Sequence, residues 1–272
     1  MGKTKTLYVS DLDGTLLTSA QTLSDYTVKT INDLAKKGLS FSYATARSFV
    51  TSHKVTEGLS DNIPVIVYNG TFILENSTGR ILMSNYFDRA DALRIGELLC
   101  KTGIQPIVYA YIDGQEKYSY VPHLINRETY EFVQTRKDKR KTEVTEEHLY
   151  DGEIFHFSCI GDKDRLFEAY NLLKNEFECV CYKEMYSGHQ WLEIQPKGAN
   201  KANAVIKLKE MLGCDRLVVF GDGVNDISMF EVSDECYAVE NAVDELKALS
   251  DGVIGGNNDD GVAKWLAENY KG

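Results

Sequence analysis

Cysteine motifs, excess positive charge and long apolar runs are all missing from this sequence of 272 residues. The six cysteines form no Cys-x-x-Cys motif and have no histidine at zinc-ligand spacing, which argues against the common zinc sites. No secretory signal pattern is present either. We therefore expect buried free thiols in a reducing compartment and a cytoplasmic protein.

Charge and hydropathy argue against two classes of partner. Lys and Arg number 30 against 41 Asp and Glu, a formal net charge of −11, so we expect neither nucleic acid nor an anionic membrane as the main partner. The longest apolar run, residues 63–68, contains a proline and is too short to cross a bilayer. An anionic substrate would have to be attracted by local cations.

The most informative segment lies near the amino terminus. Residues 7–9 have the aromatic and β-branched character of a buried strand, and Asp11 and Asp13 follow one residue apart. Residues i and i+2 of a strand share a face, so the two carboxylates repel unless one is protonated or a cation lies between them. Mg²⁺ prefers such oxygen ligands. A calcium-binding EF-hand is excluded, because Thr22 stands where it would need glutamate.

Strand-like and helical segments alternate at both ends of the chain. The predicted strands are residues 7–9, 39–44, 64–68 and 216–220, and the predicted helices follow Ser24 and span 48–58 and 200–212. This alternation is typical of an α/β fold with a doubly wound, mostly parallel sheet. Such folds bind ligands at the carboxyl edge of the sheet. Segments that follow separate strands should therefore meet there, namely Asp11 to Asp13, Thr45 to Arg47, Asn69-Gly70 and Gly221 to Asp226.

The middle of the chain has a different pattern. A helix over 88–101 is followed by two predicted strands joined by Asp113-Gly114, a hairpin signal. Later segments predict strands over 154–160, 178–186 and 190–195 and helices over 124–134 and 163–177. We interpret this region as an inserted, mostly antiparallel α+β domain with hinges near Ser84 and His189. The domains are then residues 1–84 and 190–272 for the core and 85–189 for the insert.

The clustered residues have the chemistry of phosphoryl transfer. Asp11 is the better nucleophile candidate, because it comes first after the strand and a carboxylate can attack phosphorus to form an acyl-phosphate. Asp13 could protonate the leaving oxygen and later deprotonate water. Lys197 could neutralise Asp11 and the phosphoryl oxygens. Thr45 could offer phosphate its hydroxyl and the amide of Ala46.

A second acidic segment strengthens the prediction of a cation. Asp222 and Asp226, added to the first two aspartates, form an acidic cluster that is hard to tolerate without a divalent ion. Asn225 can supply an uncharged contact to phosphate. Phosphoryl transfer depends mostly on positioning and charge neutralisation, and this set of residues contains each necessary part.

These segments resemble the motifs of the haloacid dehalogenase superfamily of phosphohydrolases, and within it the Cof-type branch. The four motifs correspond in order to Asp11-Leu12-Asp13-Gly14-Thr15, to Thr45-Ala46-Arg47, to Lys197 in Lys-Gly-Ala-Asn-Lys-Ala, and to Gly221-Asp222-Gly223-Val224-Asn225-Asp226. Many relatives have glycine where this chain has Ala46. Lys201 competes with Lys197 for the third motif, and the Pro-Lys-Gly context favours Lys197.

The resemblance implies a ligand set and a role for the insert. Mg²⁺ would be held by Asp11, the backbone carbonyl of Asp13 and Asp222, with Asp226 in support. Thr45, Lys197, Asn225 and the amide of Leu12 would hold phosphate. The insert resembles the larger α/β cap of the family, which selects the leaving group. Contacts with substrate or cap are expected among Arg47, Asn69, Gly70, Tyr186 and His189.

The leading interpretation is a Mg²⁺-dependent phosphatase that hydrolyses small phosphorylated metabolites, such as sugar phosphates, through an aspartyl-phosphate. A phosphomutase, which passes the phosphoryl group to a product hydroxyl, is the alternative enzyme. A non-catalytic binder of phosphorylated ligands, or a receiver-like signalling protein, is the alternative from another class. A dehalogenase would leave Asp13 without an evident role.

Overall fold

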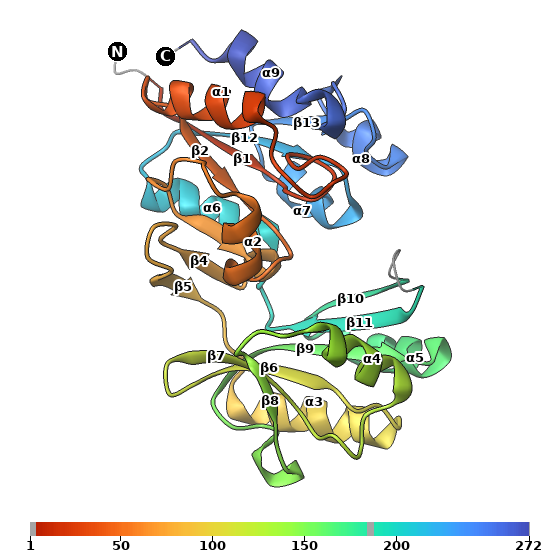
Figure 1. Cartoon of the computed structure of the whole chain (residues 1–272). Coiled ribbons are helices and arrows are strands. Elements are labelled where there is room, and N and C mark those ends of the chain that lie inside the picture. Colours follow the sequence, from red (N-terminus) through yellow and green to blue (C-terminus); the bar gives the residue numbers. More distant parts are fainter. Residues whose placement is uncertain (1–3, 184–187, 272) are drawn as a thin grey trace. The chain divides into compact units, whose positions relative to one another are not determined.

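The computed structural model describes residues 4–183 and 188–271 and divides into two compact units (Figure 1). One unit, the core unit, is built from the chain up to Ser84 and from Ala199 onward. The other, the inserted unit, is Asn85–Gly198. Tyr186, a predicted substrate contact, lies outside the described residues.

A five-stranded parallel sheet forms the centre of the core unit. Its order is β14-β13-β12-β1-β2, and every neighbouring pair is parallel. The strands are β1 (Thr6–Ser10), β2 (Ser40–Tyr43), β12 (Arg216–Gly221), β13 (Glu235–Val239) and β14 (Gly252–Ile254). The predicted α/β fold with a parallel sheet is confirmed.

A small antiparallel sheet continues from the edge at β2. A parallel bridge between Ala44 and Ile66 links β2 to the order β3-β4-β5. These strands are β3 (Val65–Val67), β4 (Phe72–Leu74) and β5 (Ile81–Ser84). The bridge places Asn69-Gly70, which follows β3, beside the second motif, which follows β2.

Helices cover both faces of the parallel sheet. Figure 1 shows α1 and α9 together on one face and α6 and α7 on the other. The helices of the core unit are α1 (Asp25–Ala35), α2 (Phe49–Val55), α6 (Lys201–Met211), α7 (Ile227–Phe230), α8 (Asp244–Leu249) and α9 (Gly261–Asn269). Because both faces are covered, the two central strands β1 and β12 are mostly apolar, and Leu7, Val9, Leu217 and Val219 are fully buried.

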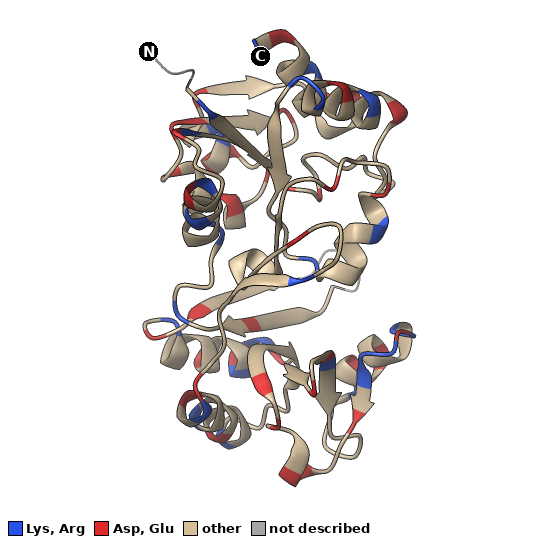
Figure 2. Cartoon of the chain, turned by 90° about the vertical axis from the view of Figure 1, so that its left-hand side faces the viewer, with Lys and Arg blue, Asp and Glu red and all other residues tan. Residues whose placement is uncertain are grey.

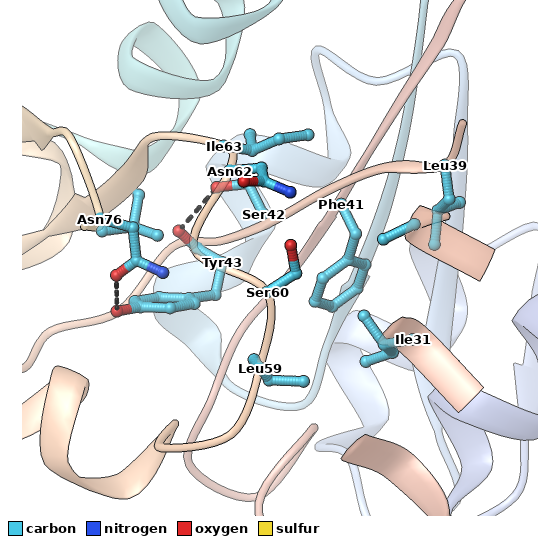
Figure 3. A pocket seen from close by; sticks show the side chains of 12 residues that line it. Ile31, Leu39, Phe41, Ser42, Tyr43, Leu59, Ser60, Asn62, Ile63 and Asn76 are labelled. Atoms are coloured by element: carbon cyan, nitrogen blue, oxygen red, sulfur yellow. Dashed lines mark hydrogen bonds between the residues drawn. The ribbon is translucent and has the colours of Figure 1, made fainter. Parts of the chain in front are cut away.

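One cavity of about 90 Å³ interrupts the core unit beside α1 and β2 (Figure 3). Ile31, Leu39 and Phe41 line its apolar side, while the Tyr43 hydroxyl lies 3.5 Å from Asn76 Oδ1 on its polar side. None of the predicted site residues is among the described residues that line this cavity. The cavity is therefore separate from the predicted site.

The inserted unit is built on a six-stranded sheet with the order β10-β11-β9-β6-β7-β8. All neighbouring pairs are antiparallel except β7 and β8. Asp113 and Gly114 both have positive φ angles at the predicted hairpin. The strands are β6 (Ile107–Ile112), β7 (Gln115–Tyr120), β8 (Lys141–Glu143), β9 (Glu153–Gly161), β10 (Glu178–Lys183) and β11 (Gln190–Gln195), and the helices are α3 (Arg89–Lys101), α4 (Arg127–Thr135) and α5 (Lys163–Leu173).

The second predicted domain boundary differs from the structure. The prediction placed Gln190–Gln195 in the core, but this strand, β11, pairs with both β9 and β10 and belongs to the inserted unit. That unit continues to Gly198. Local sequence predicts that a strand is present, whereas its neighbours in the sheet are set by tertiary packing.

The cysteines, the charged residues and the apolar segments of the sequence can each be located in the structure. All six cysteines are free. Cys159, Cys214 and Cys236 are buried and Cys179 and Cys181 are half-buried, but Cys100 is exposed, so the expectation of burial is wrong for that residue. Figure 2 shows acidic and basic residues interspersed along the helices of both units. Within residues 4–183 and 188–271, none of the helices has the length and apolar character needed to cross a membrane.

Candidate active site

Two neighbouring strands end at the acidic residues of the first and fourth motifs. Strands β1 and β12 pair in parallel with Ser10 opposite Phe220, and the amide of Asp11 donates to the Phe220 carbonyl at 2.9 Å. Asp222 follows β12 directly, and Asp226 lies at the end of the short 3-10 turn Val224–Asp226. One carboxylate oxygen from each of Asp11, Asp222 and Asp226 lies within 4.8 Å of the other two. Segments about two hundred residues apart therefore form one acidic cluster.

A buried lysine lies inside this cluster. Lys201, the first residue of α6, is 1% exposed, and its Nζ donates to Asp11 Oδ1 at 2.5 Å and to Asp226 Oδ1 at 2.6 Å. Burial alone would lower the pKa of Lys201, but the two carboxylates outweigh it and raise the pKa above its usual value. Lys201 therefore carries a positive charge at the centre of the site.

The lysine at Asp11 is not the one that the sequence favoured. Lys197 was predicted to neutralise Asp11, but it is exposed and belongs to the inserted unit, whereas Lys201 makes the contact. The Pro-Lys-Gly context is a local pattern and carries no information on burial. A better signal for the lysine is its place in the sequence. Lys201 directly follows the helix-capping residue Asn200 and is therefore the first residue of α6.

Gly70 helps to place the start of α6. The Asn200 side chain caps the helix by accepting from the amide of Asn203 at 2.9 Å. Gly70 has a φ of +102°, and a Cβ at this position would lie 2.1 Å from the Asn200 carbonyl oxygen. Only glycine allows this approach. Gly70, predicted to contact substrate or cap, thus packs against the backbone that precedes Lys201.

Asp226 is held by the protein through both carboxylate oxygens. Its Oδ2 accepts from the amides of Asp222 and Gly223 at 3.0 Å each, and its Oδ1 accepts from Lys201. The side chain is fully buried. In this arrangement Asp226 stabilises the turn after β12 and the Lys201 ammonium. Its support of a bound Mg²⁺ stays a prediction.

Asp222 is oriented by the first motif. Thr15 Oγ1 donates to Asp222 Oδ1 at 2.7 Å. Gly14 has a φ of +80°, and a Cβ there would lie 2.3 Å from Asp222 Oδ2, so this position also requires glycine. Burial raises the pKa of Asp222 to about 6, and the hydrogen bond from Thr15 opposes this shift.

The balance of charge fits a divalent cation. Burial raises the pKa of Asp11 well above its usual value; the Lys201 ammonium opposes this shift, while Asp226 and Asp222 add to it. Three carboxylates face a single ammonium group. Among the described residues, none donates a hydrogen bond to the second oxygen of Asp11 or of Asp222. Two free carboxylate oxygens in an excess of negative charge are the ligands that Mg²⁺ prefers.

Asp13 is paired with Arg47. The Arg47 Nε donates to Asp13 Oδ2 at 2.6 Å and its Nη2 donates to Asp13 Oδ1 at 2.5 Å, a bidentate contact. Nη2 also donates to Gln21 Oε1 at 3.0 Å. The Asp13 side chain is 47% exposed, so it is reachable from solvent. Arg47 was predicted as a substrate contact, and the pairing with Asp13 was not foreseen.

The second motif lies beside the segment that follows β3. The amide of Asn69 donates to the Thr45 carbonyl at 2.9 Å, and the amide of Tyr68 donates to the Arg47 carbonyl at 3.0 Å. Asn69 has a φ of +52°, and its Oδ1 accepts from Asn225 Nδ2 at 3.3 Å. Thr45, Asn69 and Asn225 are therefore brought together at the carboxyl edge of the sheet.

The chain is similar to known proteins over nearly its whole length. A family model described as haloacid dehalogenase-like hydrolase matches residues 8–266. The chain belongs to this family. The matched range includes every aspartate of the acidic cluster as well as Lys201. The predicted hydrolase of the haloacid dehalogenase superfamily is thereby confirmed.

Relatives of this hydrolase span nearly its whole length. It is 27% identical over 266 residues to a pyridoxal phosphate phosphatase, YbhA, of Escherichia coli, covering 94% of this chain and 95% of that protein. It is 28% identical over 284 residues to a 5-amino-6-(5-phospho-D-ribitylamino)uracil phosphatase, YwtE, of Bacillus subtilis, covering 96% and 97%. The crystal structure of TM0651 from Thermotoga maritima superposes with a TM-score of 0.78 at 26% identity, covering 99% and 98%.

The remaining predicted residues of the hydrolase lie in different places. Leu12 has a fully buried side chain, and Ala46 is exposed next to Thr45. His189 belongs to the inserted unit, where its Nε2 lies 3.7 Å from Glu131 Oε2. Its contact with substrate or cap stays a prediction. Thr15, which orients Asp222, was not predicted as a functional residue, although it lies within the first motif.

Proposed function

We propose that this hydrolase is a Mg²⁺-dependent phosphatase that cleaves small phosphorylated metabolites through an aspartyl-phosphate on Asp11. The observation that carries the proposal is the buried contact of Lys201 with Asp11 and Asp226 beside Asp222. Two relatives, named as phosphatases of pyridoxal phosphate and of a phosphorylated ribitylaminouracil, support the choice of small phosphate monoesters.

The proposed reaction has two steps that share one acid–base group. In the first, an Asp11 carboxylate oxygen attacks phosphorus, the phosphorus–oxygen bond to the leaving group breaks, and Asp13 donates a proton to that oxygen. In the second, Asp13 takes a proton from water, whose oxygen attacks the phosphorus and releases Asp11. The Asp13 side chain is exposed enough to reach both partners, and one of its two hydrogen bonds from Arg47 has to open when the carboxyl group carries the proton.

The phosphoryl group is proposed to bind through residues of several segments. Lys201 supplies positive charge, Thr45 its hydroxyl and the amide of Ala46, Asn225 its side-chain amide, and Leu12 its backbone amide. A Mg²⁺ ion held by Asp11, the Asp13 carbonyl and Asp222 would neutralise further negative charge on the phosphoryl oxygens. Lys201 takes the role first given to Lys197, because it alone of the two contacts Asp11.

A substrate panel with and without metal tests this proposal. The purified full chain is incubated with p-nitrophenyl phosphate, sugar phosphates, pyridoxal phosphate and 5-amino-6-(5-phospho-D-ribitylamino)uracil, and inorganic phosphate is measured. We expect phosphate release with Mg²⁺ and a loss of about 100-fold or more after chelation with EDTA, because the cluster would lose its main counter-charge. Undiminished turnover under chelation would contradict the proposed metal dependence. Isomerisation of a sugar phosphate without phosphate release would favour a phosphomutase.

The pairing of Arg47 with Asp13 gives a second prediction. Replacing Arg47 with alanine removes both hydrogen bonds that orient the Asp13 carboxylate, so proton donation to the leaving oxygen should suffer. We expect turnover of an alkyl phosphate to fall about tenfold. Turnover of p-nitrophenyl phosphate should fall less, because p-nitrophenolate leaves without a proton. The ratio of the two kcat values is the measurement.

Lys54→Ala serves as the matched control for Arg47→Ala. Lys54 is an exposed cation of α2, close to Arg47 in the sequence. Its removal should leave both turnover numbers unchanged. Equal losses on both substrates in Arg47→Ala would mean that Arg47 acts on phosphate binding and not on Asp13.

A further inference from the structure

A turn after β13 contacts both segments that carry the acidic cluster. Asn241 Nδ2 donates to the Gly14 carbonyl at 2.7 Å, and the amide of Val243 donates to the Asp222 carbonyl at 2.9 Å. Gly14 directly follows Asp13 in the chain. Two hydrogen bonds from residues 241–243 therefore join the first motif to the fourth.

The two joined segments also touch each other. A Cβ on Gly14 would lie 2.3 Å from Asp222 Oδ2, which is the oxygen that accepts no hydrogen bond from the described residues. Thr15 donates to the other oxygen of Asp222. A small shift of the Gly14 backbone would therefore change both the position and the surroundings of the available Asp222 oxygen.

The amide group of Asn241 is itself oriented by a partner. Its Oδ1 accepts from the backbone amide of Asn257 at 3.0 Å, which directs its Nδ2 toward Gly14. Asn257 is buried, and its own Nδ2 donates to the Leu17 carbonyl at 2.9 Å. The segment from Gly14 to Leu17 is thus held at both ends by asparagines that are hydrogen-bonded to each other.

We propose that Asn241 is a positioning residue for cation binding, because it sets the backbone after Asp13 relative to Asp222. This inference rests on the proposed Mg²⁺ dependence and adds a residue outside the four motifs. Asn241 does not bind the cation or the phosphoryl group; it acts through the Gly14 carbonyl. Its loss should weaken cation affinity and leave the maximal rate at saturating cation largely intact.

A variant of Asn258 can distinguish the positioning role of Asn241 from general anchoring of the same segment. Asn258 Nδ2 donates to Ser19 Oγ at 2.9 Å, and the amide of Ser19 donates to Asn258 Oδ1 at 2.9 Å. Asn258 is thus an asparagine that holds the same segment farther along, and its hydrogen bonds reach Ser19 and not Gly14. Asn258→Ala is therefore a matched control for Asn241→Ala.

The test measures Mn²⁺ binding to the full chain by electron paramagnetic resonance, without substrate, since carboxylate sites for Mg²⁺ also accept Mn²⁺. A net hydrogen-bond contribution of about 1 kcal/mol corresponds to about a fivefold change in Kd. We expect Asn241→Ala and the similarly sized Asn241→Leu to raise the Kd by roughly this factor. Asn258→Ala should leave the Kd unchanged. In turnover assays, Asn241→Ala should need about five times more Mg²⁺ for half-maximal rate, with little change in kcat.

Three results would overturn the inference. The first is an unchanged Kd in both Asn241 variants, and the second is an equal rise in Asn258→Ala, which would indicate general anchoring. Thermal unfolding of each variant shows whether the fold is kept. The third is a wild-type chain that binds no Mn²⁺, which would also contradict the Mg²⁺ dependence of the proposed function. Normal binding by the wild type with unchanged variants would reject the role of Asn241 alone.

Discussion

The Asp11→Asn variant is expected to lose about four orders of magnitude or more of phosphatase turnover while it remains folded. An amide cannot attack phosphorus as a carboxylate does, so the aspartyl-phosphate cannot form. The fold should persist, because the asparagine oxygen can still accept from Lys201 and one negative charge leaves a crowded cluster. Phosphate release with Mg²⁺ and thermal unfolding are the two measurements.

Asp33→Asn is a suitable control for this variant. Asp33 lies in α1, where its carboxylate pairs with Lys36 at the surface. The same chemical change there should leave turnover unchanged. Full activity in Asp11→Asn would exclude Asp11 as the nucleophile. A phosphorylated peptide containing Asp11, recovered from acid-quenched wild type, would support the covalent step directly.

The second large effect is expected for Lys201→Met. This change leaves the buried carboxylates of Asp11 and Asp226 without their positively charged partner. The loss should lower the free energy of unfolding by about 3 kcal/mol. Turnover should fall by about 100-fold or more, because the phosphoryl group loses a buried positive charge. Urea unfolding and steady-state kinetics measure the two effects.

Lys197→Met provides the matched comparison. Lys197 is exposed in the inserted unit, so its replacement should change neither stability nor turnover. The opposite result, with Lys197 essential and Lys201 dispensable, would restore the assignment that the sequence favoured. The double variant Lys201→Met with Asp226→Asn should recover part of the stability but not the activity, because it removes one stranded charge without returning the cation.

The acidic residues of the site could be predicted because their signal is local. Asp11 and Asp222 each follow an apolar strand, and parallel strands place their carboxyl ends on one edge. The choice between Lys197 and Lys201 could not be made in this way. It depends on which side chain is buried when α6 packs against the turn at Gly70, and that is a property of tertiary structure.

Contacts between distant segments of the chain were the part of the site that could not be predicted from the sequence. Nothing in the pattern around Arg47 indicates that its guanidinium reaches Asp13, because the two residues come from different loops. The same holds for β11, whose sequence predicts a strand but not its place between β9 and β10. The contact of Asn241 with Gly14 joins residues from opposite ends of the chain and has no local signal.

The tight backbone approaches at Gly14 and Gly70 affect how inactive variants should be read. Neither residue offers a functional group, yet one extra methyl at Gly14 would displace the Asp222 carboxylate, and one at Gly70 would displace the beginning of α6 and with it Lys201. A random-mutagenesis screen for lost activity would therefore recover alanine at both positions. Such hits would report the shape of the scaffold around the charged groups and would say nothing about contact with a ligand.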